Sequence, residues 1–156
     1  MKKNITPIVI ALTVALLDFI VKKIIESSVQ PYDVIHVLPF LNIVNVKNTG
    51  AAFGILSTMS NKIFVAVSFL AIFFIIVYIS KTSSRLEKIS LSLVLGGALG
   101  NLIDRLTIGK VIDFIDFFIG SWHWPAFNVA DSALTIGIIL FLFANIGFRR
   151  HKQEKS

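Results

Sequence analysis

The sequence predicts an all-α integral membrane protein with four transmembrane helices and a small extracytoplasmic segment that contains β-structure. Two observations support this. First, 55% of the 156 residues are hydrophobic, with a mean hydropathy of +0.82. Second, the charged residues, 15% of the chain, lie in clusters between long uncharged runs, whereas a soluble domain spreads its charges over its whole surface. We expect residues 1–156 to form a single membrane-embedded domain.

Four uncharged runs mark the expected helices. They cover residues 4–17, 63–80, 89–103 and 132–148, and each approaches the ~20 residues that cross the hydrocarbon once its flanks are included. The first run resumes beyond Asp18 without a small-residue cleavage site. We therefore expect a retained anchor instead of a cleaved signal peptide.

The distribution of basic residues predicts the orientation. Nine of the fifteen Lys and Arg residues lie in three short segments, one at each end of the chain and one between the second and third runs. Because cytoplasmic loops are enriched in Lys and Arg, both termini are expected in the cytoplasm, with residues 22–62 and 105–130 on the outer side. No base-stacking aromatics are interleaved with these basic residues, which argues for membrane lipids and against nucleic acid as their partner.

The first outer segment is expected to contain a short strand or two, followed by an interfacial piece. Residues 40–46 partly alternate between apolar and polar side chains and precede the turn-prone Asn48-Thr49-Gly50. The next run, residues 51–56, is too short to span the membrane, which predicts a short interfacial or re-entrant segment.

Ionisable residues gather at the outer ends of the predicted spans. On insertion scales such groups cost at least ~2.5 kcal/mol each, so they are candidate functional groups. They are Asp18, Asp104, Arg105, Asp113, Asp116 and Asp131. Asp18 lies four residues before Lys22, the favourable order for an ion pair on one helix face. This pair is either part of a site or a buried strut with no chemical role.

The third predicted helix carries both polar residues and glycines. Asn101, Asp104 and Arg105 share one side of it, at i, i+3 and i+4. We expect Arg105 to pair with Asp104 or with another aspartate. Gly96 and Gly100 form a small-xxx-small face, which lets a neighbouring helix approach closely.

Asp113 and Asp131 are the candidate catalytic pair. Asp113 is expected on the loop that leads into the fourth helix and Asp131 on the first turn of that helix, so folding can bring them together at the membrane surface. Two close carboxylates share one proton, so one acts as a general base on water while the other polarises the carbonyl. This predicts peptide hydrolysis with no metal and no cofactor. Asn128, one turn before Asp131, either donates a hydrogen bond at the site or caps the helix.

A metal site is the weaker interpretation of the outer acidic residues. Asp113, Asp116 and Asp131, together with His123, lack a ligand spacing such as H-E-x-x-H. His123 lies between two tryptophans, a pattern typical of an interfacial aromatic belt. Asp116 shares a face with Asp113 if this segment is helical. The chain contains no cysteine, which excludes a thiol nucleophile and a thiolate metal site.

Two function classes other than a peptidase remain open. A small transporter or channel uses intramembrane aspartates to relay protons or bind cations, but here the acids are confined to the outer third and no inverted repeat is visible. A non-catalytic assembly factor would dock through the glycine face and the aromatic rim, but it gives no reason for two aspartates beside the fourth helix. Asparagine substitution of either aspartate separates these classes, because a scaffold tolerates it and a peptidase does not.

Five blocks of sequence carry a family resemblance. They are Asp18-x-x-x-Lys22, Asn-Thr-Gly-Ala-Ala-Phe at 48–53, Gly-Gly-Ala-Leu-Gly-Asn-Leu-Ile-Asp-Arg at 96–105, Val-Ile-Asp-Phe at 111–114 and Phe-Asn-Val-Ala-Asp-Ser at 127–132. In this order, and over nearly the whole chain, they resemble the lipoprotein signal peptidase family, also called signal peptidase II. The chain departs from the family pattern at Phe19, where glutamine is expected after the aspartate.

The resemblance implies a multi-pass aspartyl endopeptidase, a hydrolase of the bacterial cytoplasmic (inner) membrane, with its active site near the extracytoplasmic face. It implies cleavage of the signal peptide from diacylglyceryl-modified prolipoproteins on the amino side of the lipidated cysteine, by a monomer that globomycin-type antibiotics inhibit. Residues 32–53 are then expected to form a cradle or flap beside the substrate. The implied site residues are the dyad Asp113 and Asp131, the lining residues Asn101, Arg105 and Asn128, and the supporting or substrate-contacting residues Asp18, Lys22, Asn48, Gly54 and Asp104.

Overall fold

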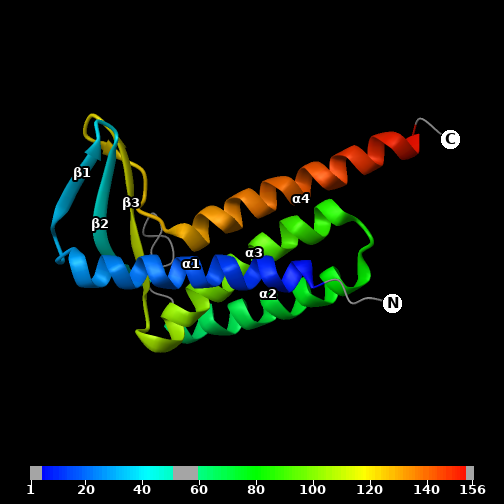
Figure 1. The fold of residues 1–156 in the computed structure, drawn as a ribbon, viewed down its shortest axis with the longest axis horizontal. Coiled ribbons are helices and arrows are strands. Elements are labelled where there is room, and N and C mark those ends of the chain that lie inside the picture. Colours follow the sequence, from blue (N-terminus) through cyan, green and yellow to red (C-terminus); the bar gives the residue numbers. More distant parts are fainter. Residues whose placement is uncertain (1–4, 51–59, 154–156) are drawn as a thin grey trace.

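The computed structural model describes residues 5–50 and 60–153, with side chains as far as residue 146. In chain order its elements are α1 (Thr6–Ser28), β1 (Val34–Leu38), β2 (Leu41–Asn48), α2 (Asn61–Lys81), α3 (Arg85–Thr107), β3 (Val111–Ile119), β4 (Trp122–His123) and α4 (Val129–Gln153). The helices run alongside one another, and an antiparallel sheet stands at one end of them (Figure 1). The start of α1, the α2–α3 connection and the far end of α4 lie at the opposite end (Figure 1).

Three of the described helices are long and apolar enough to cross a membrane. These are α2, α3 and the Val129–Ile146 part of α4. The first expected span, α1, is as long as α3 at 23 residues, but its second half carries Asp18, Lys22, Lys23 and Glu26. It also continues to Ser28, farther into the predicted outer segment than its uncharged run indicates. The charges do not end the helix, because Asp18 and Lys22 are both buried against the rest of the protein.

The sheet confirms one prediction and corrects another. The expected strand at 40–46 is present as β2, which forms a hairpin with β1. The placement of Asp113 on a loop is wrong, because residues 111–119 form β3, which pairs with β2 in a sheet of order β1-β2-β3-β4. The sequence of β3 is rich in β-branched and aromatic residues, and these favour a strand even though two aspartates interrupt them.

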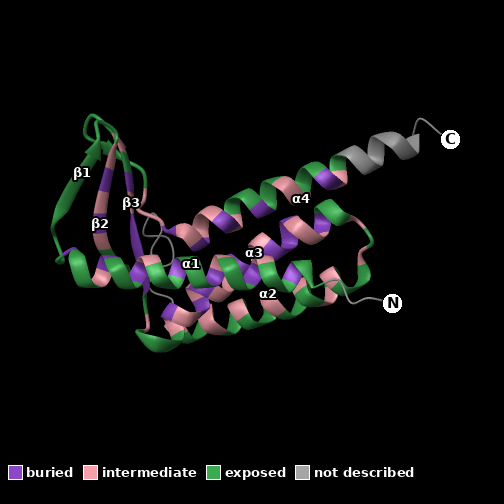
Figure 2. Cartoon of the chain, viewed as in Figure 1, coloured by how far each residue is buried: buried purple, intermediate pink, exposed green. Residues whose placement is uncertain are grey.

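A small apolar cluster attaches the sheet to the helices. Ile25 and Val29, from the end of α1 and the residue after it, pack with Ile112 and Phe114 of β3, and all four side chains are buried. Figure 2 shows burial along α1, α3 and the neighbouring strands, whereas α2 has no buried residue. The partly covered residues of α2, such as Phe64, Ser68 and Ile75, recur at helical spacing on one side, and the other sides are exposed and apolar. Such exposed apolar faces are typical of a membrane span. Because Asp113 lies between Ile112 and Phe114, this cluster also fixes the position of its backbone.

Three glycines of α3 let the neighbouring helices approach closely, as the small-xxx-small face predicts. A Cβ added at Gly96 would lie 2.7 Å from a backbone carbonyl oxygen of α1, and one at Gly97 would lie 2.4 Å from the carbonyl oxygen of Ala130 on α4. At Gly100 it would lie 2.6 Å from a carboxyl oxygen of Asp18. Gly100 therefore makes room for a buried charged residue as well as for a helix.

We expect Gly97→Ala to lower the free energy of unfolding by about 1–3 kcal/mol, because the added methyl group meets the backbone of α4, which no side-chain rotation can relieve. Thermal unfolding in detergent measures the change. Ala98→Ser, one position along the same helix, is the control and should leave the midpoint nearly unchanged. Equal midpoints for the two variants would contradict close α3–α4 packing at Gly97.

Candidate active site

Asp113 is held by two asparagines from different elements. It lies on β3 and is 2% exposed. Asn48, the last residue of β2, donates from Nδ2 to Asp113 Oδ2 at 2.8 Å, and Asn128, just before α4, donates from Nδ2 to Oδ1 at 2.7 Å. Pairing of β2 with β3, in which Asp113 lies opposite Val46, brings Asn48 to this position. Both carboxyl oxygens of Asp113 are thereby fixed.

Asp131 lies in the first turn of α4, where two more amide contacts orient it. Asn101 of α3 donates from Nδ2 to Asp131 Oδ1 at 2.7 Å, and the Asp131 backbone N–H donates to Asn128 Oδ1 at 2.8 Å. The oxygen of Asn128 therefore caps α4, while its Nδ2 donates to Asp113. The two roles expected for Asn128 are combined in one buried side chain, which connects the two aspartates.

A buried lysine sets the orientation of Asn101. Lys22 Nζ lies 2.7 Å from Asp18 Oδ2 and 2.9 Å from Asp104 Oδ2, and it donates to Asn101 Oδ1 at 3.1 Å. An ammonium group only donates hydrogen bonds, so Asn101 must present its oxygen to Lys22 and its Nδ2 to Asp131. The predicted Asp18–Lys22 ion pair is confirmed, and this chain of contacts joins it to the aspartates.

Arg105 does not form the ion pair that we expected. Its neighbour Asp104 contacts Lys22 and accepts from the Ile112 backbone N–H at 3.0 Å. Among the described residues, no carboxylate lies within ion-pair distance of Arg105. Its guanidinium instead lies over the Phe64 ring of α2, with Cζ 4.4 Å from the ring centroid, and its buried Nη1 has no hydrogen-bond partner within residues 5–50 and 60–146. Successive residues of a helix point about 100° apart, so Arg105 faces α2 while Asp104 faces α1.

Asp113 and Asp131 line the same cavity. Its volume is ≈ 700 Å³, within the range of pockets that hold drug-sized ligands. Both polar and apolar side chains line it. The polar lining includes Asn48, Arg105, Asp113 and Asp131, and the apolar lining includes Phe64, Trp124, Phe127 and Ile136.

The surroundings of Asp113 favour its protonated form. Burial raises the pKa of Asp113 to about 7, with a further contribution from the negative charge of Asp131. The hydrogen bonds from Asn48 and Asn128 act in the opposite direction, since they stabilise the carboxylate. A carboxyl group with a pKa near 7 can hold a proton at neutral pH and release it during a reaction.

Asp116 belongs to a separate network on the sheet. The expectation of a helical face shared with Asp113 is wrong, because in a strand residues three apart point to opposite sides. Asn42 donates to Asp116 Oδ2 at 2.9 Å, and His123 Nδ1 lies 2.9 Å from Asp116 Oδ1. His36 Nδ1 lies 2.8 Å from the other end of Asn42, at Oδ1. Within the described ranges, no group of three or more acidic or histidine side chains is arranged to hold a metal ion.

Two of the predicted features lie outside the described residues. They are Gly54 and the short segment 51–56. Phe19, the departure from the family pattern, is described: it is 39% exposed, whereas the adjacent Asp18 is fully buried. Phe19 therefore points away from the buried polar chain, and its identity leaves the contacts of Asp18 unchanged.

Thr135 and Phe64 are among the lining residues that were not predicted from the sequence. Thr135 follows Asp131 by four residues on α4 and donates from its hydroxyl to the Asp131 carbonyl oxygen at 2.9 Å. The four-residue spacing alone could have indicated that Thr135 lies on the same side of the helix as Asp131. Phe64 is different, because nothing in the sequence places this residue of α2 beside Arg105. Asn61 makes that contact possible by donating to the Arg105 carbonyl oxygen at 2.9 Å.

Comparison with known proteins points to one family. A model of the family described as signal peptidase (SPase) II matches residues 10–146. A lipoprotein signal peptidase of Thermodesulfovibrio yellowstonii is 42% identical over 134 residues, which cover 85% of this chain and 89% of the relative. One of Burkholderia mallei is 46% identical over 139 residues, which cover 86% and 83%.

Solved structures show the same fold. A structure described as a bacterial membrane enzyme, at 2.3 Å resolution, matches with a TM-score of 0.87 and 38% identity over 97% of this chain and 93% of that one. A second bacterial membrane enzyme, at 1.9 Å resolution, matches with a TM-score of 0.81 and 39% identity over 89% and 91% of the two chains.

Proposed function

Because the chain belongs to the signal peptidase II family of aspartic peptidases, we propose that Asp113 and Asp131 together activate the water that hydrolyses its substrate. The observation that carries this proposal is that both side chains line one cavity and are connected through Asn128. A transporter is not favoured, because the relatives that this chain matches over most of its length are named lipoprotein signal peptidases.

In the first step Asp131 is the general base and Asp113 the general acid. Asp131 takes a proton from water as the water oxygen bonds to the scissile carbonyl carbon, and Asp113 gives its proton to the carbonyl oxygen. In the second step Asp113 recovers a proton from a hydroxyl of the tetrahedral intermediate, and Asp131 protonates the amide nitrogen as the C–N bond breaks. The products are a carboxylic acid and an amine, and both aspartates return to their starting protonation states.

The neighbouring polar residues position this pair and the substrate. Lys22, held by Asp18 and Asp104, orients Asn101, which in turn fixes the carboxylate plane of Asp131. Nη1 of Arg105, which has no hydrogen-bond partner among the described residues, is a buried donor on a residue that lines the cavity. We assign it to the substrate carbonyl oxygen, where negative charge develops in the transition state.

The proposed substrates are prolipoproteins with a diacylglyceryl-modified cysteine, cut on the amino side of that cysteine. The names of the relatives support prolipoproteins as the class. The apolar residues of the cavity lining, among them Phe64, Phe127 and Ile136, suit a substrate that carries acyl chains and a hydrophobic signal helix. The sheet beside it, with Asn48 at the end of β2, would form the described part of the cradle.

We further propose that α1 is a fourth membrane span of a monomer in the bacterial inner membrane. Its apolar side chains, such as Leu12 and Leu16, point outward, while Asp18 and Lys22 are buried against the other helices. Asp113 and Asp131 lie at the sheet end of the helices, and α1 begins and α4 ends at the other, basic end (Figure 1). The positive-inside rule then places both termini in the cytoplasm and the site near the extracytoplasmic face.

Cleavage of a prolipoprotein by the purified protein in detergent tests this function. We expect cleavage of the diacylglyceryl-modified precursor in preference to the unmodified one, inhibition by a globomycin-type antibiotic, and full activity in excess chelator. Activity lost with chelator and restored by a metal ion would contradict the aspartyl mechanism. If thermal unfolding shows that the protein is folded and it still does not cleave the precursor, the function itself is contradicted.

The activity is expected to fall as the pH rises through about 7, because Asp113 then loses the proton that it donates. The stability should change in the same direction. The pKa of Asp113 is raised above its ordinary value of 3.8. The stability that Asp113 contributes is therefore complete below pH 3.8 and is lost as the pH rises through about 7. Thermal midpoints measured between roughly pH 5 and 8 should show this loss in the parent chain and a flatter profile in Asp113→Asn. Parallel profiles would argue against a raised pKa.

A further inference from the structure

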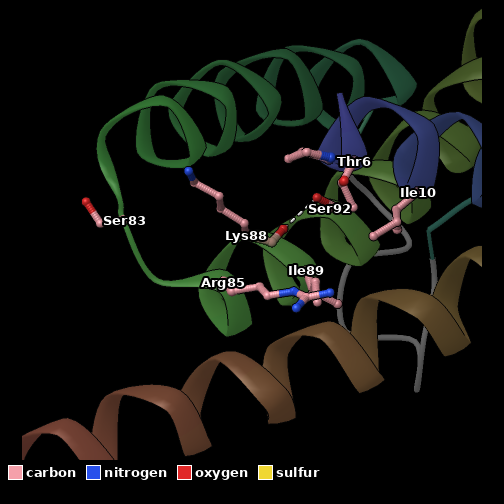
Figure 3. Close-up of a pocket in the computed structure, with 8 residues that line it drawn as sticks. Thr6, Ile10, Ser83, Arg85, Lys88, Ile89 and Ser92 are labelled. Atoms are coloured by element: carbon pink, nitrogen blue, oxygen red, sulfur yellow. Dashed lines mark hydrogen bonds between the residues drawn. The ribbon is translucent and has the colours of Figure 1, made fainter. Parts of the chain in front are cut away.

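A second cavity lies at the opposite end of the helices from the two aspartates. Its volume is ≈ 280 Å³, and it lies between the start of α1 and the start of α3. Figure 3 shows Arg85 and Lys88 extending from the first turns of α3 in different directions, and Thr6 of α1 and the buried Ser92 of α3 also line the cavity. Two cationic side chains thus line one space, and Arg and Lys are the usual partners of a phosphate group.

Arg85 and Lys88 have no acidic partners in the described part of the chain. Neither side chain forms an ion pair there. Glu87, which lies between them in the sequence, is buried and accepts a hydrogen bond from the Thr82 hydroxyl. Both cations also lie in the first turns of α3, where the helix dipole disfavours positive charge. Helix stability therefore does not explain their position, whereas the enrichment of basic residues in cytoplasmic connections and an anionic ligand both do.

An apolar groove adjoins the basic cavity. Its volume is ≈ 480 Å³, and it shares Pro7 and Lys88 with that cavity. The rest of its lining is mainly aliphatic and comes from α1, α2 and α3. Ile8 and Ile76 on its walls are each more than half exposed, so the groove opens on the outer surface of the helices. Lys88 lies where the charged space meets the apolar one.

We propose that this end of the protein binds an anionic phospholipid, with its phosphate beside Arg85 and Lys88 and an acyl chain in the groove. Charge complementarity supports the head group, and the shared wall of the two spaces supports a ligand that is charged at one end and apolar at the other. Basic pockets between membrane helices bind anionic head groups in this way. This inference goes beyond peptide hydrolysis and does not depend on it.

Native mass spectrometry of the full chain in detergent, titrated with phosphatidylglycerol, tests the head-group site. We expect Arg85→Gln/Lys88→Gln to raise the Kd for phosphatidylglycerol roughly tenfold and to leave the weaker binding of phosphatidylcholine unchanged. The matched control, Lys81→Gln/Lys110→Gln, removes the same charge from residues that line neither space. An equal loss in the control, or equal affinity of the parent chain for both lipids, would overturn the proposal.

A second pair of variants tests the groove and keeps both cations. Ile8→Trp narrows the groove, so the Kd for phosphatidylglycerol should rise. Val9→Trp should not change this Kd, because Val9 is exposed and lines neither the cavity nor the groove. Soluble glycerol phosphate should bind far more weakly than the lipid. Binding as tight as that of the lipid, or no difference between the two tryptophan variants, would reject an acyl chain in the groove. Thermal unfolding verifies that each variant is folded.

Discussion

Asp113→Asn and Asp131→Asn are each expected to lower kcat/KM for prolipoprotein cleavage by roughly 10³-fold or more, because each removes a group that transfers a proton. Asparagine has nearly the same shape as aspartate, so the cavity should keep its form. At Asp131 the substitution can preserve the contact with Asn101, since one oxygen accepts it. At Asp113 both oxygens accept amide N–H groups, so the asparagine variant also loses one hydrogen bond. Initial rates on a diacylglyceryl-modified precursor measure the effect.

Asp116→Asn is the matched control for these variants. Asp116 lies on the same strand as Asp113, is also buried and also accepts from an asparagine, but its network leads to His123 and not to the cavity. We expect the kcat/KM of Asp116→Asn to stay within about tenfold of that of the parent chain. The double variant Asp113→Asn/Asp131→Asn should be no slower than either single variant, because residues that act as a unit are not additive. Greater loss in Asp116→Asn than in either dyad variant would reject the assigned dyad.

Lys22→Met is expected to lower the free energy of unfolding by about 3–5 kcal/mol, because it leaves two buried carboxylates without their cation. Lys22 is 1% exposed and contacts both Asp18 and Asp104. For a chain of this size, such a loss lowers the thermal midpoint by roughly 10 °C. The activity should fall as well, since Asn101 is no longer forced to turn its Nδ2 toward Asp131.

Lys23→Met, at the next position of α1, is the control. Lys23 is 54% exposed and pairs with Glu26 at the surface, and such pairs contribute less than about 1 kcal/mol. Adding Asp18→Asn and Asp104→Asn to Lys22→Met removes the uncompensated charges and should recover part of the lost stability without restoring the activity. Equal midpoints for Lys22→Met and Lys23→Met would show that the buried ion pairs contribute little.

Much of the membrane architecture could be predicted from the sequence, because it depends on local pattern. Uncharged runs predicted the helices, and the glycine spacing predicted the close packing of α3 against its neighbours. The Asp18–Lys22 pair followed from helical spacing, since residues four apart on a helix are already neighbours. The strand at residues 40–46 followed from the alternation of apolar and polar side chains.

The predictions that were wrong involve contacts between elements. Arg105 was expected to pair with an aspartate, but α2 packs against its side of α3, and the Phe64 ring occupies that position. Asp113 was expected on a loop, because residues 111–119 have no regular period and gain their strand structure from pairing with β2. For the same reason the network around Asp116 was not foreseen.

The sequence by itself determined that this is a membrane protein with acidic residues at one end of its helices, because hydrophobicity and charge are properties of each residue and its near neighbours. The tertiary structure alone decided which polar group meets which. Asn128 joins the two aspartates, and Lys22 reaches Asp131 only through Asn101. Apart from the cap between Asn128 and Asp131, these contacts join residues 15 to 79 positions apart. Buried polar groups form such long-range hydrogen bonds only when packing has excluded water as the alternative partner.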